Sequence, residues 1–282
     1  MPSEAPKEFD YTMLSTFLRC RKRYYWRIVR NIVSKSPQTA LEFGKCIHKA
    51  LDEWHKHRNE EAALNVFLTK YKEDPSDDKR TLIVGKKLLQ LYFDKYAHES
   101  FEVLASELPF TAPVNAGISL IGRIDKIVKW DGVIYVLDHK TTSRLGYEFF
   151  YKIKPNMQFD GYIWAARQLG YPTCSGIVLD ALLTAKGLTV PAQLAKLTPL
   201  ARDVSMRTEK DIAKYLRNLP LIVEDIRKCY DTNIWYENTE ACCDFIECPY
   251  RKICKEDEDI HERIISMDYK VEPWDPRNVE VE

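Results

Sequence analysis

An Asp-Gly pair near the middle of the chain lies between two long apolar runs, and this arrangement restricts the fold more than any other feature of the sequence. The runs are residues 118–130 and 133–141, and the pair between them is Asp131-Gly132. Asp-Gly in this setting is a strong signal for a hairpin with a two-residue turn. The sequence therefore predicts two antiparallel strands joined by a tight turn.

A two-residue turn also fixes which side chains of the hairpin face each other. If Trp130 pairs with Val133, stepping back along both strands brings Asp125 directly opposite Asp138. The Cβ atoms of facing residues lie about 4.5–5.5 Å apart, so two carboxylates placed in this way repel each other. The neighbouring residues on the same face are apolar, and solvent should therefore screen the repulsion poorly.

Two arrangements would relieve this repulsion. Lys140 is two residues beyond Asp138 and hence on the same face of the strand. A hard divalent cation held by both carboxylates would act more completely, because Mg²⁺ prefers oxygen ligands and keeps the bound waters that hydrolysis needs. A plain Asp–Lys salt bridge on a solvated sheet face is the alternative, and the facing Asp125 leaves the two interpretations evenly balanced.

The hairpin is embedded in a longer alternation of helical and strand patterns. Helices are expected over residues 11–29, 40–57, 60–71, 79–96, 156–169 and 208–230, and strands over residues 101–110, 118–130, 133–141 and 175–183. Thr12 or Ser15 is the expected cap of the first helix, and Gly170 ends the fifth. The order of the elements predicts an α/β or α+β core in which helices flank a mixed sheet.

Four short motifs resemble those of a known nuclease family. Residues 122–125, followed by residues 136–141, are similar to the signature of PD-(D/E)XK nucleases. Residues 43–48 match the Gly-x-x-x-His motif of the RecB-like branch, and residues 158–162 match its Gln-x-x-x-Tyr motif. All four occur in the order typical of that branch. The resemblance implies a restriction-endonuclease-like core.

The resemblance also implies an active site. It assigns the catalytic metal, Mg²⁺ or Mn²⁺, to four ligands, which are His48, Asp125, Asp138 and the carbonyl of His139. Lys140 would orient or activate the attacking water and stabilise charge on the phosphate, while Gln158 and Tyr162 would position the DNA or the lysine. Glu107, on the preceding strand, is a candidate ligand of a second metal. An exposed strand glutamate is the simpler account of that residue.

The cysteines near the end of the chain extend the resemblance. Residues 242–254 are similar to the ending of iron–sulfur nucleases of the phage, CRISPR-adaptation, AddB and exonuclease V types, where one further cysteine precedes the Gly-x-x-x-His helix. The resemblance implies a [4Fe–4S] cluster on Cys20, Cys242, Cys248 and Cys254, with Cys243 as the alternative to Cys242. Structural zinc also takes four thiolates, but one remote and three clustered cysteines favour the iron–sulfur cluster. Its expected role is a structural staple, and a redox role stays open.

Charge gives a weaker indication of a partner. The chain has 42 basic and 42 acidic residues, and a net charge of zero does not by itself point to nucleic acid. Basic residues nevertheless crowd residues 19–30, where they are mixed with the aromatic residues 24–26. This mixture suits phosphate contact and base stacking on a nucleic-acid strand. A solvated amphipathic helix is the alternative.

One RecB-like nuclease domain is expected over the whole chain. Its parts would be a helical region (1–100), the catalytic core (101–190), a C-terminal helix with the cysteines (191–264) and a charged tail (265–282). No run of about 18 apolar residues occurs, and the first residues lack the apolar stretch of a secretory signal. The expected location is the cytoplasm of a prokaryote or of the host of a virus, without membrane contact.

The expected function is metal-dependent hydrolysis of DNA. We expect an exonuclease that acts on single strands or free ends, rather than an endonuclease, in recombination, repair or phage DNA processing. A catalytically inactive nuclease fold that binds DNA or acts as a scaffold is the first alternative. A zinc-stapled DNA-binding protein with an incidental acidic pair is the second. The sequence contains no helicase motif, so any helicase or recombination partner would be a separate protein.

Overall fold

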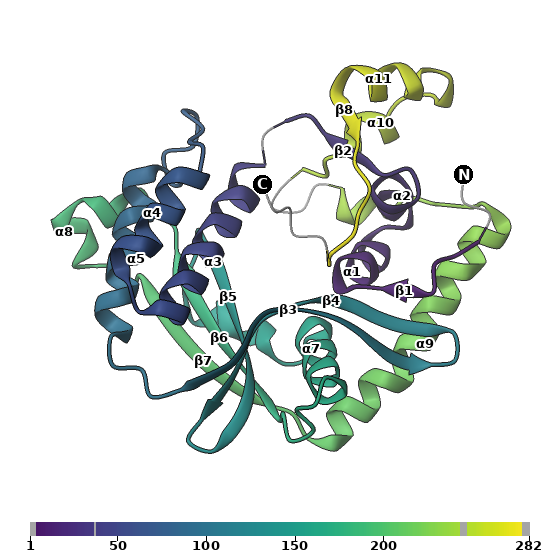
Figure 1. Cartoon of the computed structure of the whole chain (residues 1–282). Helices are drawn as coiled ribbons and strands as arrows, with labels where there is room; N and C mark the ends of the chain where they lie inside the picture. Colours follow the sequence, from purple (N-terminus) through teal and green to yellow (C-terminus); the bar gives the residue numbers. More distant parts are fainter. Residues whose placement is uncertain (1–3, 37, 243–246, 278–282) are drawn as a thin grey trace. The chain divides into compact units, whose positions relative to one another are not determined.

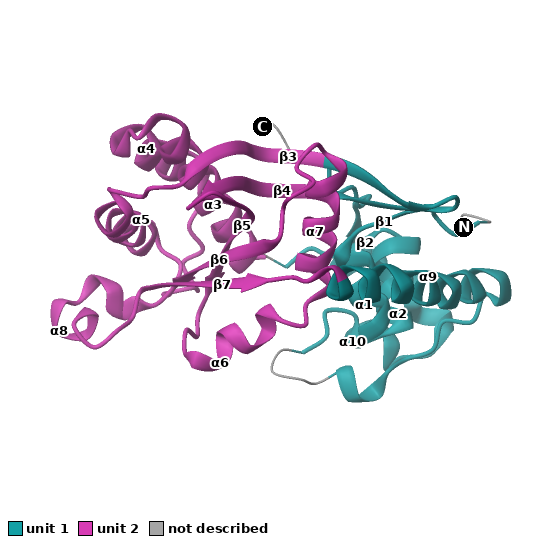
Figure 2. Cartoon of the chain, turned by 90° about the horizontal axis from the view of Figure 1, so that it is seen from below, with its two compact units in different colours: residues 1–37, 110–122, 210–282 teal, residues 38–109, 123–209 magenta. Residues whose placement is uncertain are grey.

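The computed structural model describes residues 4–36, 38–242 and 247–277. The chain forms two compact units, which Figure 2 distinguishes by colour. Unit 1 consists of residues 1–37, 110–122 and 210–282, and unit 2 of residues 38–109 and 123–209. None of the helices in the described residues is long and apolar enough to cross a membrane.

Unit 2 contains most of the sheet and the helices that cover it. Its helices are α3 (Thr39–His57), α4 (Glu60–Lys70), α5 (Leu82–Tyr96), α6 (Tyr147–Phe150), α7 (Met157–Gln168) and α8 (Pro191–Leu194), with short 3-10 helices at Tyr151–Ile153 and Lys186–Thr189. Its strands are β3 (Glu102–Asn115), β4 (Ile118–Trp130), β5 (Val133–Thr142), β6 (Gly176–Leu183) and β7 (Leu200–Met206), of which β3 and β4 also supply residues to unit 1.

The sheet is mixed, as the sequence predicts. The strand order is β1-β4-β5-β6-β7, and β3 pairs with β4. The strands β4 and β5 are antiparallel, β5 and β6 are parallel, and β6 and β7 are antiparallel. Helices α3 and α7 both contact β5, and they cover opposite faces of the sheet (Figure 1). The strand β5 therefore lies between two helical layers.

The central hairpin has the predicted turn and register. Asp131 and Gly132 have φ angles of 48° and 81°, which are the positive values that a type I′ turn requires. Trp130 pairs with Val133, and the pairing continues without a slip to Lys126 opposite Leu137. The short turn therefore sets the register of both strands.

Two predicted elements differ from the structure by three residues or more at one end. Helix α5 begins at Leu82 rather than at residue 79, because Thr81 caps it by accepting a hydrogen bond from Val84 N at 3.2 Å. Strand β3 continues to Asn115 although it contains two prolines. Among the described strands β3 pairs with β4 alone, and an edge strand tolerates proline because one side of its backbone needs no partner.

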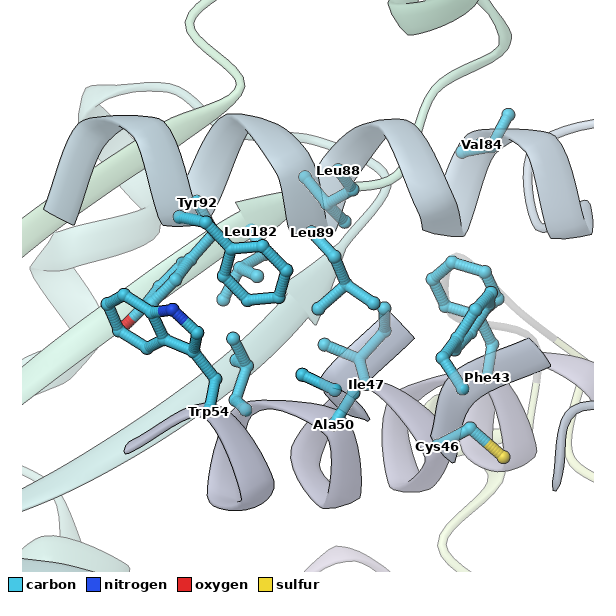
Figure 3. Close-up of a cluster of buried hydrophobic side chains, with 14 of the residues drawn as sticks. Phe43, Cys46, Ile47, Ala50, Trp54, Val84, Leu88, Leu89, Tyr92 and Leu182 are labelled. Atoms are coloured by element: carbon cyan, nitrogen blue, oxygen red, sulfur yellow. The ribbon is translucent and has the colours of Figure 1, made fainter. Parts of the chain in front are cut away.

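The core of unit 2 lies between α3, α4, α5 and the sheet. Apolar side chains recur on one face of α3 at helical spacing, and Figure 3 shows them facing α5. Phe43, Ile47 and Leu89 are fully buried there, and Leu182 of β6 joins the same cluster. This packing fixes α3, which carries one of the predicted site residues, against the sheet.

Unit 1 consists of shorter elements. They are β1 (Glu8–Phe9), α1 (Tyr11–Arg19), α2 (Arg21–Tyr24), a π-helix (Tyr25–Val29), β2 (Ile32–Ser34), all but the first residue of α9 (Glu209–Thr232), 3-10 helices at Thr239–Ala241 and Glu258–Ile260, α10 (Arg251–Cys254), α11 (His261–Asp268) and β8 (Tyr269–Val271). The strand β1 pairs with β4 in parallel through Glu8 and Ser119. The strands β2 and β8 form a separate two-stranded sheet.

The first predicted helix is divided in the structure. Cys20 has an extended backbone (φ −166°, ψ 122°) and separates α1 from α2. The cap of α1 is Asp10, not Thr12 or Ser15, because its Oδ1 accepts a hydrogen bond from Met13 N at 2.6 Å. The predicted caps are wrong because the helix begins one residue before Thr12.

Several short elements were not expected from the sequence, among them the strands β7 and β8. The strand β7 has a mixed burial pattern with exposed positions, so its apolar residues do not form a clear strand signal. The strand β8 lies in the segment expected to be a charged tail, and it pairs with β2 from Ile32–Val271 to Ser34–Tyr269. A strand of three residues is too short to show a period, and only its distant partner stabilises it.

Candidate active site

The two aspartates of the hairpin lie close together. Asp125 is on β4 and Asp138 on β5, one residue beyond the last assigned pair of the register. The side chain of Asp138 is 1% exposed and that of Asp125 is 16% exposed. The backbone N–H of His139 donates a hydrogen bond to Asp125 Oδ2 at 3.1 Å, which holds that carboxylate against β5.

Their shared environment drives the pKa values of the two aspartates apart. Burial raises the pKa of Asp138 above its usual range, and the charge of Asp125 adds to the rise in opposition to Lys140. Burial alone would also raise the pKa of Asp125, but the neighbouring His48 and Lys140 outweigh it, so that this pKa falls below its usual range. The site therefore favours one fully charged carboxylate beside a second that is costly to ionise.

Lys140 is the cation nearest to Asp138. Its Nζ lies 2.9 Å from both Oδ1 and Oδ2, so the salt bridge that the sequence left as an alternative is present. Only Oδ1 has hydrogen-bond geometry, and the buried Oδ2 accepts no hydrogen bond in the described part of the chain. A buried acidic oxygen without a donor suits a metal ion, because a cation needs no hydrogen atom.

His48 reaches the acidic pair from α3. Its Nδ1 lies 3.2 Å from Asp125 Oδ2. Burial opposes protonation of His48, but the charge and hydrogen bond of Asp125 prevail and raise its pKa. Gly44 lies one turn earlier on α3, and a Cβ at that position would be only 3.1 Å from Thr141 Oγ1. The glycine thus lets the helix approach β5 closely enough for His48 to reach the site.

Gln158 and Tyr162 face the site from α7. Asn156 caps this helix by accepting hydrogen bonds from two backbone N–H groups of its first turn. A spacing of four residues places Gln158 and Tyr162 on one helix face, and Gln158 Nε2 donates to the Tyr162 hydroxyl at 2.9 Å. Burial raises the pKa of Tyr162, and the ammonium of Lys140 is near enough to oppose that rise.

Glu107 is near the acidic pair rather than out in solvent. Its backbone is left-handed (φ 48°) inside β3, an uncommon conformation for a residue other than glycine. Burial raises the pKa of Glu107, and Asp125 is the next contributor to that rise. Arg123 Nη1 lies 3.7 Å from Glu107 Oε2. The structure therefore places a third carboxylate beside the hairpin.

The imidazole of His139 lies between Asp125 and a second polar group, with its Nδ1 3.9 Å from Asp125 Oδ2. Its Nε2 lies 3.3 Å from the Tyr92 hydroxyl and 3.7 Å from Asp180 Oδ2, on the face of the sheet covered by α3 and α5. The ring is 1% exposed. The backbone N–H of His139 lies nearer to Asp125 than the ring does, at 3.1 Å against 3.9 Å from Oδ2.

A buried polar network behind His139 was not expected from the sequence. Asp180 of β6 accepts a hydrogen bond from the Tyr92 hydroxyl at 2.8 Å and from Arg202 Nη2 at 2.7 Å. Arg202 Nη2 also donates to Glu99 Oε1 at 2.5 Å, and Glu99 Oε2 lies 3.4 Å from His55 Nε2. One signal could have revealed it, because Asp180 is the only charged residue in the otherwise apolar β6.

Lys126 is a second group that sequence reasoning missed. This lysine is 1% exposed, and its Nζ lies 3.8 Å from Asp52 Oδ1. Burial lowers the pKa of Lys126, although Asp125 and Asp52 oppose the shift. Asp52 is on α3 one turn after His48, so the same helix that approaches Asp125 also supports the buried ammonium.

The cysteines predicted as cluster ligands lie in one region of unit 1. Cys20 Sγ accepts a hydrogen bond from Asn238 N at 3.3 Å, and Cys242 Sγ donates to Asn238 O at 3.6 Å. The N–H of Cys248 donates to the Cys242 carbonyl at 3.0 Å. Burial raises the pKa of Cys254 to about 11, with a contribution from Cys248. The alternative ligand, Cys243, lies outside the described residues.

No ligand set is preassembled in the described residues. Across residues 4–36, 38–242 and 247–277, no three or more His, Cys, Asp and Glu side chains are grouped so that they could hold a metal ion as they stand. Within unit 2 the acidic pair, and within unit 1 the cysteines, therefore do not form a complete ligand set as they stand.

The basic segment at residues 19–30 is largely occupied by contacts within unit 1. Arg21 stacks over the rings of Phe17 and Tyr236, at 5.0 and 5.1 Å from their centroids. Arg30 Nη2 lies 2.8 Å from Glu262 Oε1. Trp26 is 3% exposed and belongs to a core cluster. These contacts favour the interpretation of the segment as a structural element over that of a free DNA-binding helix.

Comparison with known proteins adds the family. Residues 9–255 match the sequence profile of the PD-(D/E)XK nuclease superfamily. No curated protein matches the chain. A solved protein of Eubacterium rectale, described as a candidate exonuclease, is 13% identical with a TM-score of 0.50, over 84% of this chain and 86% of that one. An alkaline exonuclease of Laribacter hongkongensis is 12% identical with a TM-score of 0.28, over 67% of this chain and 93% of that one.

The profile match covers most of the chain, including both strands of the hairpin, and the Eubacterium rectale protein has a similar fold. The geometry agrees with that match, because the hairpin, α3 and α7 bring the residues of all four motifs to one end of β5. The chain belongs to the PD-(D/E)XK nuclease superfamily.

Proposed function

We propose that this protein is a metal-dependent DNA nuclease of the RecB-like branch, with an iron–sulfur cluster in its C-terminal segment. The observation that carries the proposal is the buried pair Asp125 and Asp138 with Lys140 beside it. Two carboxylates at this depth are costly without a cation, and Lys140 hydrogen-bonds only one oxygen of Asp138. A structural sheet would gain little from such an arrangement.

The residues present fit a hard divalent cation. Asp125, Asp138 and His48 would hold Mg²⁺ or Mn²⁺ together with the carbonyl of His139, and Glu107 is near enough to Asp125 to serve a second ion. When bound, the ion would lower the pKa of its water and neutralise charge on the phosphate. The proposal is supported by the position of His48, whose Nδ1 lies 3.2 Å from Asp125 Oδ2.

The remaining residues act on the substrate and the water. The Lys140 side chain is 37% exposed, so its ammonium can leave Asp138 and hydrogen-bond the attacking water or a phosphate oxygen. It stabilises the negative charge that develops on the phosphorane oxygens. The hydrogen bond from Gln158 orients the Tyr162 hydroxyl toward Lys140, so this pair positions the lysine or the strand.

Cys20, Cys242, Cys248 and Cys254 are the proposed ligands of a [4Fe–4S] cluster. The proposal is supported by the contacts that Cys20 and Cys242 share with Asn238, and by the backbone hydrogen bond between Cys242 and Cys248. Trp26 Nε1 donates to Cys254 Sγ at 3.4 Å, the type of contact that tunes cluster thiolates. The cluster would staple the two ends of one nuclease domain together.

The proposed substrate is DNA with single strands or free ends, and the proposed reaction is exonucleolytic. Any helicase or recombination protein would act as a separate partner. End-labelled linear and circular single strands with Mg²⁺ or Mn²⁺ separate the two modes of cleavage. An exonuclease degrades the linear strand and leaves the circle intact, whereas degradation of the circle would identify an endonuclease.

The site assignment is tested with Asp138→Ala and Lys140→Ala. We expect either change to lower cleavage by at least about 10²–10³-fold, the usual effect of removing a preorganised electrostatic group. Asp94→Ala is the matched control, because Asp94 is an exposed residue of α5. Circular dichroism checks the fold of each variant. Wild-type cleavage by either site variant would mean that the acidic pair is structural.

A further inference from the structure

The short helix α6 and the turn after it carry a dense group of aromatic residues. Tyr147, Phe149, Phe150 and Tyr151 occur within five positions. Tyr147 is 79% exposed and Tyr151 is 61% exposed, while Phe149 and Phe150 are half-buried. The rings of Tyr147 and Tyr151 contact each other edge to face, with centroids 4.9 Å apart. Single exposed aromatics are ordinary, but an adjacent exposed pair of this kind marks an interaction site.

Along the sequence, this aromatic pair comes between the two elements that carry the proposed catalytic residues. The segment follows β5, which carries Lys140, and precedes α7, which carries Gln158. Figure 2 shows α6 at the periphery of unit 2, next to the sheet. Thr142, the last residue of β5, fixes the start of the segment, because its hydroxyl donates to Arg144 O at 2.9 Å and accepts from Arg144 N at 3.2 Å.

The far end of the segment is equally well held. Ile153 is 7% exposed, and its carbonyl accepts a hydrogen bond from the buried Arg207 at 2.5 Å. Arg207 also contacts Asp160 of α7 at 2.5 Å, and Asn156 Nδ2 donates to Lys152 O at 2.8 Å. The tyrosines are thus exposed on a segment that is anchored at both ends. A ligand would meet rings that need little ordering on binding.

The charge around the tyrosines favours a polyanion. Three basic residues (Arg144, Lys152 and Lys154) and one acidic residue (Glu148) are exposed between residues 143 and 155. A protein partner with an acidic surface could use the charge and also pack against the rings, and sedimentation of the variants detects such a partner. A strand with unpaired bases uses both, since its phosphates contact the lysines and its bases stack on the rings.

We propose that Tyr147 and Tyr151 form a stacking platform for unpaired bases of a single-stranded nucleic acid. The inference rests on the proposed nuclease function, and it adds how the strand is held where it leaves the acidic site. Stacking on tyrosine requires bases that are free of their complement, so the platform selects single strands or frayed ends over an intact duplex. It does not depend on sequence, because every base has a flat face.

The test is equilibrium binding of labelled oligonucleotides by the full chain in EDTA, so that no cleavage occurs. Three ligands of equal length are compared, namely a mixed-sequence single strand, the same backbone with abasic sites, and a blunt duplex. The variants are Tyr147→Ala with Tyr151→Ala, and Tyr147→Phe with Tyr151→Phe. Tyr11→Ala controls for the loss of an exposed tyrosine elsewhere, because Tyr11 is 37% exposed at the start of α1.

We expect the double alanine variant to bind the mixed-sequence strand about 5- to 150-fold more weakly for each stacked base lost. The double phenylalanine variant should bind as the wild type does, because it keeps both rings. Neither change should alter binding of the abasic strand or the duplex. Unchanged binding of the abasic strand and the duplex by the alanine variant separates loss of stacking from loss of structure.

Unchanged binding of the mixed-sequence strand by the double alanine variant would overturn the platform. An equal loss on the abasic strand would overturn it too, because stacking needs bases. If the alanine variant instead changes the sedimentation of the protein and leaves strand affinity alone, the surface is a protein contact. Ring-dependent binding by a wild-type chain that cleaves no DNA supports the platform and refutes the nuclease, so the two failures are distinguishable.

Discussion

Asp125 and Asp138 are chemically the same residue in two different settings. Asp125 accepts a backbone hydrogen bond and faces His48, whereas Asp138 is almost wholly buried and depends on Lys140. The side chain of Asp125 is therefore ionised more readily than that of Asp138. A cation bound between them would satisfy both, and its binding energy would appear as added stability of the folded chain.

Metal binding can accordingly be measured without any cleavage. We expect Mg²⁺ or Mn²⁺ at about one hundred times its dissociation constant to stabilise the wild type by about 2.7 kcal/mol. In Asp125→Asn and Asp138→Asn this gain should disappear, because each loses an anionic ligand, while Asp94→Ala should keep it. Thermal melting with and without metal is the measurement. An equal shift in Asp138→Asn would place the bound ion elsewhere.

His139 offers a test that depends on pH. Burial lowers the pKa of its imidazole well below the ordinary value, so the folded chain keeps it neutral. Below about pH 6.5 the unfolded chain binds this proton and the folded chain does not, and stability is lost as the pH falls. The loss should approach about 1.4 kcal/mol per pH unit well below pH 6.5, where the unfolded histidine is fully protonated.

Replacing the imidazole removes that dependence. The free energy of unfolding of the wild type, minus that of His139→Asn, should therefore shrink by about 1 kcal/mol from pH 6.5 to pH 5.5. Urea unfolding at several pH values gives the difference, and other titrating groups cancel in it. A difference that stays constant with pH would show that the imidazole is already protonated in the fold or is free to titrate.

Among the elements, β6 and β7 are tied to α5 by Asp180 and Arg202. Asp180 receives hydrogen bonds from both Tyr92 and Arg202 at a position that is 1% exposed. Removing one partner of a buried ion pair leaves the other charge uncompensated. Asp180→Ala should thus lower the free energy of unfolding by about 3–5 kcal/mol.

The neighbouring strand provides the control. Asp203 of β7 is exposed, and Asp203→Ala should change the free energy of unfolding by less than about 0.5 kcal/mol. Urea unfolding of both variants gives the comparison. Similar values for the two would mean that water replaces the lost carboxylate and that the network adds little to stability.

The sequence predicts the elements with a strong local signal and misses those stabilised from afar. The two-residue turn at Asp131-Gly132 predicts the register of β4 and β5 because its geometry is local. The strands β2 and β8 are three residues long and exist through each other, over a separation that no local pattern records. The same contrast holds within the site.

Motif spacing predicts the site residues that approach one another, and it does not predict their support. The contact between His48 and Asp125 follows the family motifs. The network of Tyr92, Asp180 and Arg202 draws one residue from each of three elements, and no spacing along the chain connects them. The variants of Asp138, Lys140 and Cys248 test the roles of the predicted residues.

At the scale of the whole molecule, the proposed cluster joins segments that are distant in sequence. We expect Cys248→Ala to lose iron and acid-labile sulfide and to yield little folded protein, because the staple is a large part of the stability of a small unit. Cys174→Ala should do neither, since Cys174 is a buried residue just before β6, in unit 2.

Anaerobic purification followed by iron and sulfide assays is the measurement. Iron equal to that of the wild type in Cys248→Ala would show that the ligand set is wrong. Zinc in place of iron in the wild type would retain the staple but change its chemistry.

Unit 1 takes most of its residues from the two ends of the chain, together with the segment 110–122. Unit 2 consists of the remaining residues between 38 and 209. Ribosomes add about 5–20 residues per second, and domains fold as they emerge. Unit 2 can therefore fold while about the last quarter of the chain is still being made. Cys20 and β2 leave the ribosome tens of seconds before Cys248 and β8. The N-terminal segment can pair with β8 and Cys248 only after these have been synthesised. Insertion of the proposed iron–sulfur cluster would therefore follow the folding of unit 2.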